Sequence, residues 1–307
     1  MAMNNSGLVS VIMPAYNAES TILESCRSVL NQSYDNIELV VVNDGSTDGT
    51  LSKIEELRHS DPRVVLVTLK NGGVSKARNF GISVARGSFI AFLDADDIYD
   101  KEKVKKQVKA LNNLKCDAVI SGVKRFTETL GDKRWLQGSL PPRNNEYISF
   151  SDVLLRLPTS NYALFHTALA RKEVFRSGEC YSESLKTGED WDYWLRLSQK
   201  FRFRALYEEL YFYRKHDASA TSSYTDLMTL KTHLEIFNKY HSAHALGRSE
   251  ARKWILAKYL EFFNNCLYKS HYREAGAIFI RGVLNTSMIF RRRFYEILKD
   301  RIKEKVF

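Results

Sequence analysis

The chain has 307 residues, 44% of them hydrophobic and 12% aromatic, which supports a large buried core and excludes an intrinsically disordered protein. Its four cysteines lie far apart and form no Cys-x-x-Cys pair, so we expect reduced thiols in a cytosolic protein rather than a disulfide framework or a zinc site. The net charge of +10 is concentrated near the end, because residues 225–307 hold 16 Lys and Arg against 8 Asp and Glu.

The N-terminal sequence shows no basic-then-apolar secretory leader, and the chain contains no run of about 18 apolar residues that could span a bilayer. We therefore expect a cytoplasmic protein. The basic surplus of the last quarter predicts an anionic partner for that region, although solvated helix faces would produce the same composition. An anionic membrane surface, such as the inner face of the plasma membrane, would be a partner of this kind.

The first 130 residues alternate between β-branched apolar runs and helical patterns. This alternation predicts an α/β fold with a Rossmann-type, mostly parallel sheet that is flanked by helices. The strands are almost continuously apolar, as expected for strands that are buried on both faces. The expected strands are Leu8–Met13, Ile37–Val42, Val64–Leu69, Phe89–Leu93 and Ala118–Val123, and the expected helices are Ser20–Leu30, Thr50–His59, Val74–Ala85 and Lys101–Leu114.

The remaining elements are less regular. Glycine, proline and asparagine residues predict an irregular loop over Trp135–Asn145. A short strand is expected near Thr167–Ala170, and a helix is expected from about Asp190 to Gln199. From residue 222 onward the pattern is mostly helical, which predicts a basic helical extension over 222–307 after an α/β domain over 1–221. Its clearest apolar face consists of Ile255, Tyr259, Phe262, Phe263, Cys266 and Leu267.

Polar clusters follow three of the expected strands. They are Pro14–Asn17 after the first, Asn43–Thr50 after the second and Asp94–Asp97 after the fourth. Ligands bind at the carboxyl ends of strands in a sheet of this type, so these clusters mark the expected site. A turn and a helix cap would explain the second cluster equally well if it stood alone.

The segment Asp94-Ala95-Asp96 carries two carboxylates at alternate positions after an apolar strand. Side chains at i and i+2 of a strand point to the same side, so Asp94 and Asp96 are expected to converge. Two carboxylates held close together repel unless one is protonated or a cation lies between them. Mg²⁺ or Mn²⁺ prefers such oxygen ligands, with substrate phosphates completing the coordination. A solvated acidic turn is the alternative.

Two helix starts add further candidates. Asn71-Gly72-Gly73 precedes a helix, so backbone N–H groups there could approach an anion, and Arg78 one turn later could reach a phosphate or a base. Glu189 and Asp190 lie in the first turn of another expected helix. Either one could serve as the general base that takes a proton from an attacking hydroxyl. Simple helix entry and helix capping are the corresponding structural alternatives.

Six ordered segments together resemble the family 2 glycosyltransferases, which have the GT-A fold and use nucleotide-sugar donors. The resemblance covers about residues 8–220 and implies a GT-A-like domain whose halves, about 1–130 and 131–221, bind the nucleotide sugar and the acceptor. Residues after about 222 match no motif of the family. The matching segments are Val9–Glu19, Val41–Asp48, Asn71–Gly81, Phe92–Asp97, Thr187–Asp190 and Tyr213–Ser219.

The resemblance implies roles for individual residues. The nucleotide and its ribose would be contacted by the first strand end, by Asp44, which would accept the N3–H of uracil, and by residues of the third and fourth segments. Cytosine lacks that N–H, whereas thymine carries it, so a UDP-sugar is expected and a dTDP-sugar is less favoured. The residues implied for nucleotide-sugar binding are Pro14, Ala15, Tyr16, Glu19, Asp44, Arg78, Asp94 and Ala95.

In the implied reaction, Asp190 is the general base with Glu189 beside it near the acceptor, and a single displacement inverts the anomeric centre. Asp96 would bind Mn²⁺ or Mg²⁺, and His216 would be a further metal ligand or else a structural histidine. The acceptor would be a glycan or a lipid-linked glycan in cell-surface polysaccharide synthesis. The helices over 222–307 would serve an anionic membrane, a homodimer interface or the acceptor pocket, and no nucleic acid is expected as a partner.

Two other functions fit parts of the pattern. A nucleotidyltransferase would also combine a nucleotide-binding sheet with metal-binding aspartates, but its first strand would lead into a more glycine-rich phosphate loop than Pro14–Asn17. A catalytically inactive sugar-nucleotide binding module would lack one of the aspartates at positions 94, 96 and 190, and all three are present.

Overall fold

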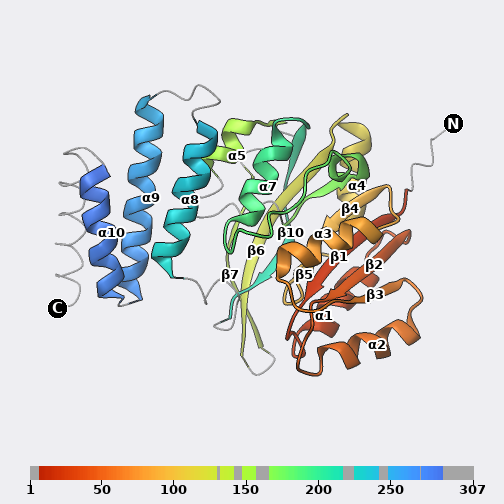
Figure 1. The fold of residues 1–307 in the computed structure, drawn as a ribbon. Coiled ribbons are helices and arrows are strands. Elements are labelled where there is room, and N and C mark those ends of the chain that lie inside the picture. Colours follow the sequence, from red (N-terminus) through yellow and green to blue (C-terminus); the bar gives the residue numbers. More distant parts are fainter. Residues whose placement is uncertain are drawn as a thin grey trace. The chain divides into compact units, whose positions relative to one another are not determined.

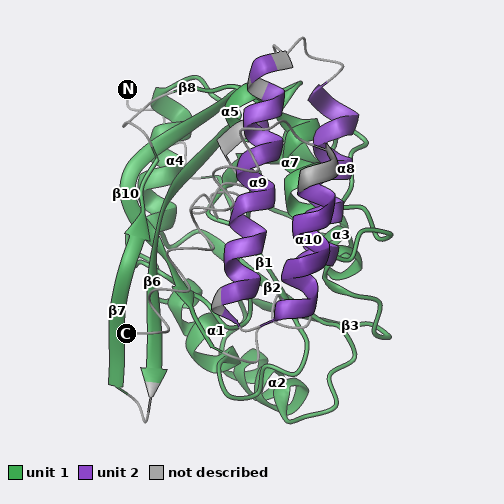
Figure 2. Ribbon diagram, turned by 90° about the vertical axis from the view of Figure 1, so that its left-hand side faces the viewer, with its two compact units in different colours: residues 1–153, 160–217 green, residues 154–159, 218–307 purple. Residues whose placement is uncertain are grey.

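The computed structural model describes residues 7–129, 132–141, 147–156, 166–216, 225–241, 248–269 and 271–285. The chain forms two compact units (Figure 2). Residues 1–153 and 160–217 make up the first unit, and residues 154–159 and 218–307 make up the second.

The first unit is built on one mixed sheet with the strand order β3-β2-β1-β4-β9-β6-β10-β5, in which β7 also pairs with β6 and β8 with β10 (Figure 1). Strands β3, β2, β1 and β4 are mutually parallel, as expected from the alternation of strands and helices. The strands are β1 Val9–Ala15, β2 Ile37–Asn43, β3 Val64–Thr68, β4 Phe89–Phe92, β5 Ile98–Tyr99, β6 Ala118–Thr129, β7 Asp132–Ser139, β8 Tyr147–Ile148, β9 Leu169–Arg171 and β10 Phe203–Arg214.

Helices cover both faces of the parallel strands, because successive residues of a strand point to opposite sides. Val11 and Met13 of β1 share one core with apolar residues of α1, α2 and α4. On the other face, α3 packs so close to β1 that a Cβ at Gly81 would collide with the side chain of Ile12. The helices of this unit are α1 Ile22–Leu30, α2 Thr50–Ser60, α3 Val74–Val84, α4 Lys103–Asn113, α6 Lys172–Phe175 and α7 Glu189–Ser198, and α5 Phe150–Arg156 begins in this unit and ends in the second.

Antiparallel pairs complete the sheet. The short strand β9 lies between β4 and β6 and is antiparallel to both, so it joins the N-terminal strands to the rest of the sheet. Strand β10 runs parallel to β6 and antiparallel to β5 and β8. The fold class predicted from the sequence is confirmed, and these pairs make the second half of the sheet mixed.

The loop predicted over Trp135–Asn145 is wrong in its first half, because β7 forms an antiparallel pair with β6 there. Aromatic rings of the preceding strand β6 and of the distant strand β10 pack on this segment. The Trp135 ring contacts Phe126 of β6 at a centroid distance of 5.5 Å and Phe212 of β10 at 5.1 Å. Residues 142–145 of the predicted loop lie outside the described residues.

The second unit contains three described helices, α8 Asp226–His241, α9 Arg248–Tyr268 and α10 Tyr272–Asn285. Helix α9 packs against both α8 and α10 (Figure 1). The apolar face predicted on α9 forms the core here, where Tyr259, Phe262, Phe263 and Cys266 are buried together with Ile278 of α10. None of the described helices combines the length and the apolar composition that crossing a bilayer requires.

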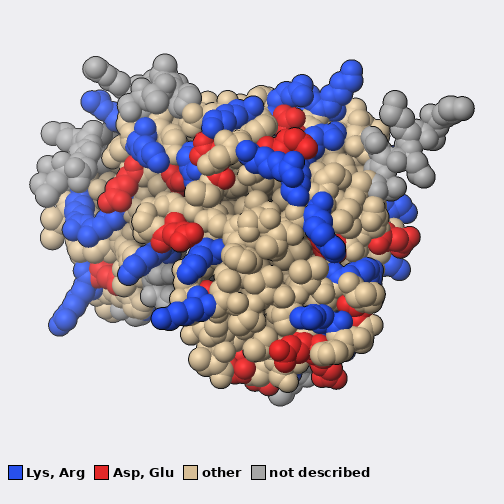
Figure 3. Space-filling model, turned by 45° about the vertical axis from the view of Figure 1, so that its right-hand side comes forward, with Lys and Arg blue, Asp and Glu red and all other residues tan. Residues whose placement is uncertain are grey.

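Positively and negatively charged side chains are mixed on the face of the molecule that Figure 3 draws. On the face drawn in Figure 3, basic and acidic side chains are interspersed around a wide uncharged area. The basic clusters Arg291–Arg293 and Lys299–Lys305, on which the expectation of an anionic partner partly depends, lie outside the described residues.

Candidate active site

The three polar clusters and the glycine pair that the sequence singled out follow the carboxyl ends of the four parallel strands. At the end of β2, the buried Asp44 accepts hydrogen bonds from two backbone N–H groups, those of Gly72 at 2.9 Å and Gly73 at 2.7 Å. Gly73 precedes α3 with φ at 90°, a conformation that favours glycine. Asp44 therefore fixes the glycine pair that opens α3, and each of its oxygens keeps a second lone pair for a ligand.

The loop after β1 is tied to the loop after β2. Asn17 accepts the N–H of Thr47 at 2.8 Å, and Glu19 accepts the N–H of Gly49 at 3.0 Å and faces Lys53 at 3.5 Å. Pro14 and Ala15 end the buried strand β1, whereas the Tyr16 side chain beyond them is exposed. The first two motifs thus form one connected wall of the site, with an exposed aromatic ring at its edge.

Arg78 lies one turn into α3 and is buried, with 3% of its surface exposed. Its guanidinium donates to Asp94 at 2.9 Å and to Glu189 at 3.1 Å, and it lies 5.4 Å from the centre of the Tyr181 ring. Arg78 therefore joins the end of β4 to the start of α7. The contact with a nucleotide or diphosphate expected for Arg78 would have to be made in addition to these two ion pairs.

Helix α7 begins at Glu189, directly after Gly188, whose φ of 73° lies in the left-handed region. This turn places Glu189 and Asp190 side by side in the first turn of α7, where the helix dipole favours negative charge. The Asp190 carboxylate accepts the N–H of Trp191 at 2.7 Å. Burial and the adjacent Asp190 raise the pKa of Glu189, although Arg78 opposes this effect.

His166 lies between the carboxylates of Asp94 and Asp190. Its Nδ1 is 3.6 Å from Asp94 and its Nε2 is 3.3 Å from Asp190. Burial alone would lower the pKa of His166, but the two carboxylates outweigh burial and raise it to about 9. In turn, His166 and Arg78 hold the pKa of Asp190 below its usual value against the opposing effect of burial. Asp190 is therefore ionised at neutral pH.

Asp94 and Asp96 have different partners. Strand β4 ends at Phe92, and a turn closed by the Asp97 N–H and the Asp94 carbonyl follows, so the alternation of a strand does not extend over these aspartates. Asp94 pairs with Arg78 and His166, whereas Asp96 lies 2.9 Å from Nε2 of His216. Burial and Asp94 raise the pKa of Asp96.

The pair of Asp96 and His216 fits a divalent metal ion by the chemistry of its donor atoms. A carboxylate oxygen and an imidazole nitrogen at hydrogen-bond distance are ligands that Mn²⁺ accepts, and both side chains are about one-third exposed, so a phosphate could complete the coordination. Arg214 braces this segment, since its Nε donates to the Asp96 carbonyl at 2.8 Å and its other nitrogens pair with Glu24 and Glu128.

Asp97 holds the segment from the other side. This buried carboxylate accepts the Tyr211 hydroxyl at 2.7 Å and the Arg214 N–H at 2.8 Å. Burial and the neighbouring Asp96 raise its pKa well above the usual value. Asp97 therefore acts in the fold by fixing the turn that presents Asp94 and Asp96.

Hydrogen bonds and ion pairs connect the ends of β2 and β4 with the start of α7. Asp44 binds the start of α3, Arg78 of the same helix binds Asp94 and Glu189, and His166 continues from Asp94 to Asp190. Sequence reasoning assigned no role to His166, Tyr181 or Asp97, although Asp97 belongs to the predicted cluster Asp94–Asp97. No spacing rule links His166 to residues 94 and 190, whereas the acidic residue directly after Asp96 was a signal that could have been followed.

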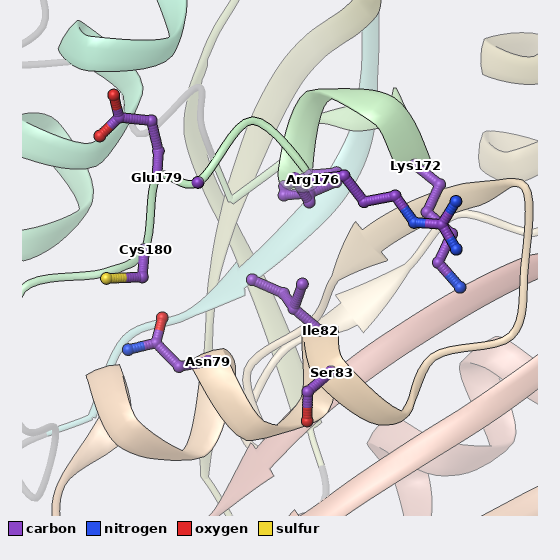
Figure 4. A pocket seen from close by; sticks show the side chains of 9 residues that line it. Asn79, Ile82, Ser83, Lys172, Arg176, Glu179 and Cys180 are labelled. Carbon is purple, nitrogen blue, oxygen red and sulfur yellow. The ribbon is translucent and has the colours of Figure 1, made fainter.

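A separate hollow of about 370 Å³ lies beside the C-terminal half of α3 (Figure 4). Asn79, Ile82 and Ser83 form one wall, Lys172 and Arg176 lie near each other at one end, and Cys180 lies at the other end. Asn79 is committed to the fold, because its side chain both donates to and accepts from the backbone of Tyr181. The hollow does not contain the carboxylates described above.

Comparisons with known proteins identify the family. The sequence profile described as Glycosyl transferase family 2 matches residues 10–178. An uncharacterized glycosyltransferase of Haemophilus influenzae is 32% identical over 230 residues, which are 72% of this chain and 70% of that protein. The hyaluronan synthase of Pasteurella multocida is 27% identical over 269 residues, which are 85% of this chain but only 26% of that much longer protein.

Solved structures share the fold. Residues 1–349 of S. aureus TarS, solved in complex with UDP-GlcNAc, align with a TM-score of 0.64 and 23% identity over 85% of this chain and 73% of that chain. The mannosyltransferase PcManGT of Pyrobaculum calidifontis, solved with GDP-Man and Mn²⁺, aligns with a TM-score of 0.59 and 19% identity over 98% of this chain and 81% of that chain. The profile match and the Haemophilus relative together show that the chain belongs to glycosyl transferase family 2 and is an enzyme of the glycosyltransferase class.

Proposed function

We propose that this enzyme transfers a sugar from a UDP-sugar to a hydroxyl of a glycan or a lipid-linked glycan, with inversion at the anomeric carbon. One observation carries the proposal: two carboxylates at the start of α7 are joined through Arg78 and His166 to the aspartate at the end of β4. This arrangement brings a candidate base close to the strand end at which the donor is expected.

The donor is expected along the strand ends. In this proposal, Asp44 accepts the N3–H of uracil with a lone pair that the two glycine N–H groups leave unused. Pro14, Ala15 and Tyr16 would border the base, and Glu19 and Ala95 would lie near the ribose. UDP is preferred to dTDP because the related TarS structure contains UDP-GlcNAc, although the carboxylate itself does not distinguish uracil from thymine.

The base is assigned to Asp190. It is ionised because His166 and Arg78 lower its pKa, so it can take the proton of the acceptor hydroxyl as the oxygen attacks the anomeric carbon. Glu189 is held by Arg78 and would orient the acceptor rather than accept its proton. Because a single attack from the side opposite the leaving group suffices, no residue needs to form a covalent bond to the sugar.

Asp96 and His216 would hold the Mn²⁺ or Mg²⁺ of the active site, and Arg214 and Asp97 would keep Asp96 in place. A bound divalent ion would supply positive charge next to the leaving diphosphate. The presence of Mn²⁺ in the PcManGT complex supports this assignment. The polysaccharide synthases among the relatives support an acceptor that is a growing glycan.

The division of labour along the chain stays a prediction. Residues 1–130 would bind the donor, and 131–221 would bind the acceptor. The helices over 222–307 would meet an anionic membrane, a second copy of the chain or the acceptor. In this proposal the enzyme is cytoplasmic, and the inner face of the plasma membrane is the anionic surface that these helices would meet.

The test is sugar transfer and UDP release with a panel of UDP-sugars and oligosaccharide acceptors. We expect Asp190→Asn to lower kcat about 10³-fold, since a positioned base contributes on that order, while the affinity for UDP stays nearly unchanged. Asp132→Asn is the matched control, because Asp132 is exposed at the start of β7 and should leave the rate unaltered. Near-normal transfer by Asp190→Asn would exclude Asp190 as the base.

Removal of divalent ions tests the role of Asp96. We expect EDTA to abolish transfer and Mn²⁺ or Mg²⁺ to restore it. Asp96→Asn should weaken the binding of Mn²⁺, measured by calorimetry in the presence of UDP, without unfolding the protein. Full activity after exhaustive chelation would remove Asp96 and His216 from their assigned role.

A further inference from the structure

His166 has two acidic partners on two different elements. One ring nitrogen faces Asp94 after β4 at 3.6 Å, and the other faces Asp190 in α7 at 3.3 Å. A neutral imidazole carries only one N–H, so it could donate to one carboxylate and would set a lone pair against the other. An imidazolium presents an N–H toward each carboxylate, so two ionised partners favour the charged form of His166.

The charges around His166 alternate in sign. Arg78 lies between Glu189 and Asp94, and His166 lies between Asp94 and Asp190, so five side chains alternate between acid and base. The oxygens of Asp94 are divided between the two cations, with Oδ1 facing Arg78 and Oδ2 facing His166. Without His166, Arg78 alone would face three carboxylates, and Asp190 would lose its nearest cation.

The backbone next to His166 is firmly held. The hydroxyl of the fully buried Thr167 accepts the Ser121 N–H at 2.9 Å and donates to the Ser121 carbonyl at 3.1 Å. Its carbonyl accepts from Gln107 at 2.8 Å and from the buried ammonium of Lys103 at 2.9 Å. Burying a lysine is costly unless its ammonium is hydrogen-bonded, and here the Thr167 carbonyl accepts one of its hydrogen bonds. Several buried polar groups therefore fix the backbone of the residue that follows His166.

We propose that His166 is a positioning residue, a fixed cation that bridges the donor-side carboxylate Asp94 and the base Asp190 and holds Asp190 in line with the acceptor. The proposal rests on the function proposed above, because it takes Asp190 to be the base. His166 itself is not the base, since both of its nitrogens are occupied by carboxylates. Its effect on transfer passes through the orientation and the charge of Asp190.

The kinetic test compares His166→Asn with wild type. We expect kcat for transfer to fall about 10- to 100-fold, as misplacing a reacting group by about 1 Å can do, while KM for the UDP-sugar changes less than about threefold. His59→Asn is the matched control, because His59 is exposed on α2 and its Nδ1 lies 2.6 Å from the Glu55 carbonyl of its own helix. A wild-type kcat in His166→Asn, alongside an inactive Asp190→Asn, would overturn the inference and leave the proposed function standing.

A second measurement does not depend on activity. The thermal midpoints of His166→Asn, Asp190→Asn and the double variant form a cycle that reports whether the two side chains interact. We expect the thermal midpoint of the double variant to fall by about 3 °C less than the sum of the decreases in the two single variants. Losses that add to within about 1 °C would show that the bridge does not exist. If the wild type transferred no sugar from any UDP-sugar, the proposed function would fail. The cycle of thermal midpoints would still show whether His166 and Asp190 interact.

Discussion

Replacing Arg78 with methionine tests the charged centre of the site most directly. Arg78 is the buried member of two ion pairs, at 2.9 Å to Asp94 and 3.1 Å to Glu189. Removing one partner of a buried pair typically costs about 3–5 kcal/mol, because the remaining charge stays desolvated. The side chains of Asp94 and Glu189 are 27% and 15% exposed, so water screens them in part, and we expect the lower end, about 3 kcal/mol.

Urea unfolding followed by tryptophan fluorescence measures this loss, and Arg78→Met should also lower Tm by about 6–10 °C. Arg78→Lys should lose less, about 1–2 kcal/mol, because an ammonium keeps the charge but cannot fork to both carboxylates. Adding Glu189→Gln to Arg78→Met should recover about 1 kcal/mol, because it removes one of the unpaired charges.

The loss should also depend on pH. Burial raises the pKa of Asp94, but Arg78 and His166 outweigh burial and lower it. The stability gained from a depressed pKa is present above the usual value of Asp, about 3.8, and is lost as the pH falls through the lower pKa of the folded state. The difference in the free energy of unfolding between wild type and Arg78→Met should therefore become smaller below about pH 4. A loss under about 1 kcal/mol at pH 7, or one that Glu189→Gln leaves unchanged, would refute this account.

Three further predictions concern stability. Gly188→Ala should destabilise the protein by about 1 kcal/mol, because φ at Gly188 is 73°. The same change at the exposed Gly276 inside α10 should stabilise the protein by about 0.5–1 kcal/mol. Chemical denaturation of the two variants measures both effects. Trp135→Ala should cost about 1–2 kcal/mol by urea unfolding if β7 packs as described, and an unchanged midpoint would contradict that packing. Wild type should have a larger free energy of unfolding than His166→Asn, by at most about 3 kcal/mol, because the pKa of His166 rises to about 9 in the folded state. This difference should be fully present below pH 6.5 and should be lost as the pH rises through about 9. Unfolding curves recorded over a series of pH values measure it.

The parallel half of the fold could be predicted because its signals are local. Strands β1 to β4 are short and mostly apolar, with β-branched residues prominent in β1 to β3, and turn-forming residues mark where each one ends. Strand β7 could not be predicted in this way, since glycines, prolines and asparagines dominate its neighbourhood. Trp135 of β7 contacts Phe126 of the preceding strand β6 and Phe212 of β10, and the contact with Phe212 joins residues that are far apart in sequence.

The site was predictable to a similar extent. The rule that ligands bind at the carboxyl ends of parallel strands located Asp44 and Asp94. Glu189 and Asp190 were candidates at a helix start, and the family resemblance selected Asp190 as the base. The rule of alternating side chains failed for Asp94 and Asp96, because β4 ends before them and a turn gives them different partners. His166 was beyond reach, since its role depends on where β9 brings it rather than on its neighbours in the sequence.

The position of β9 has a consequence for how the protein is made. The short strand β5 separates β4 from β6 along the chain, and in the sheet the described residues 169–171 lie between β4 and β6 and pair with both. On a translating ribosome, the first 130 residues therefore cannot complete their sheet until about forty more have emerged, and the exposed side of β4 is left without its neighbour for that interval. Chain synthesis and sheet closure are coupled at this short strand, so slowing translation just before residue 169 would prolong a state with an open strand edge.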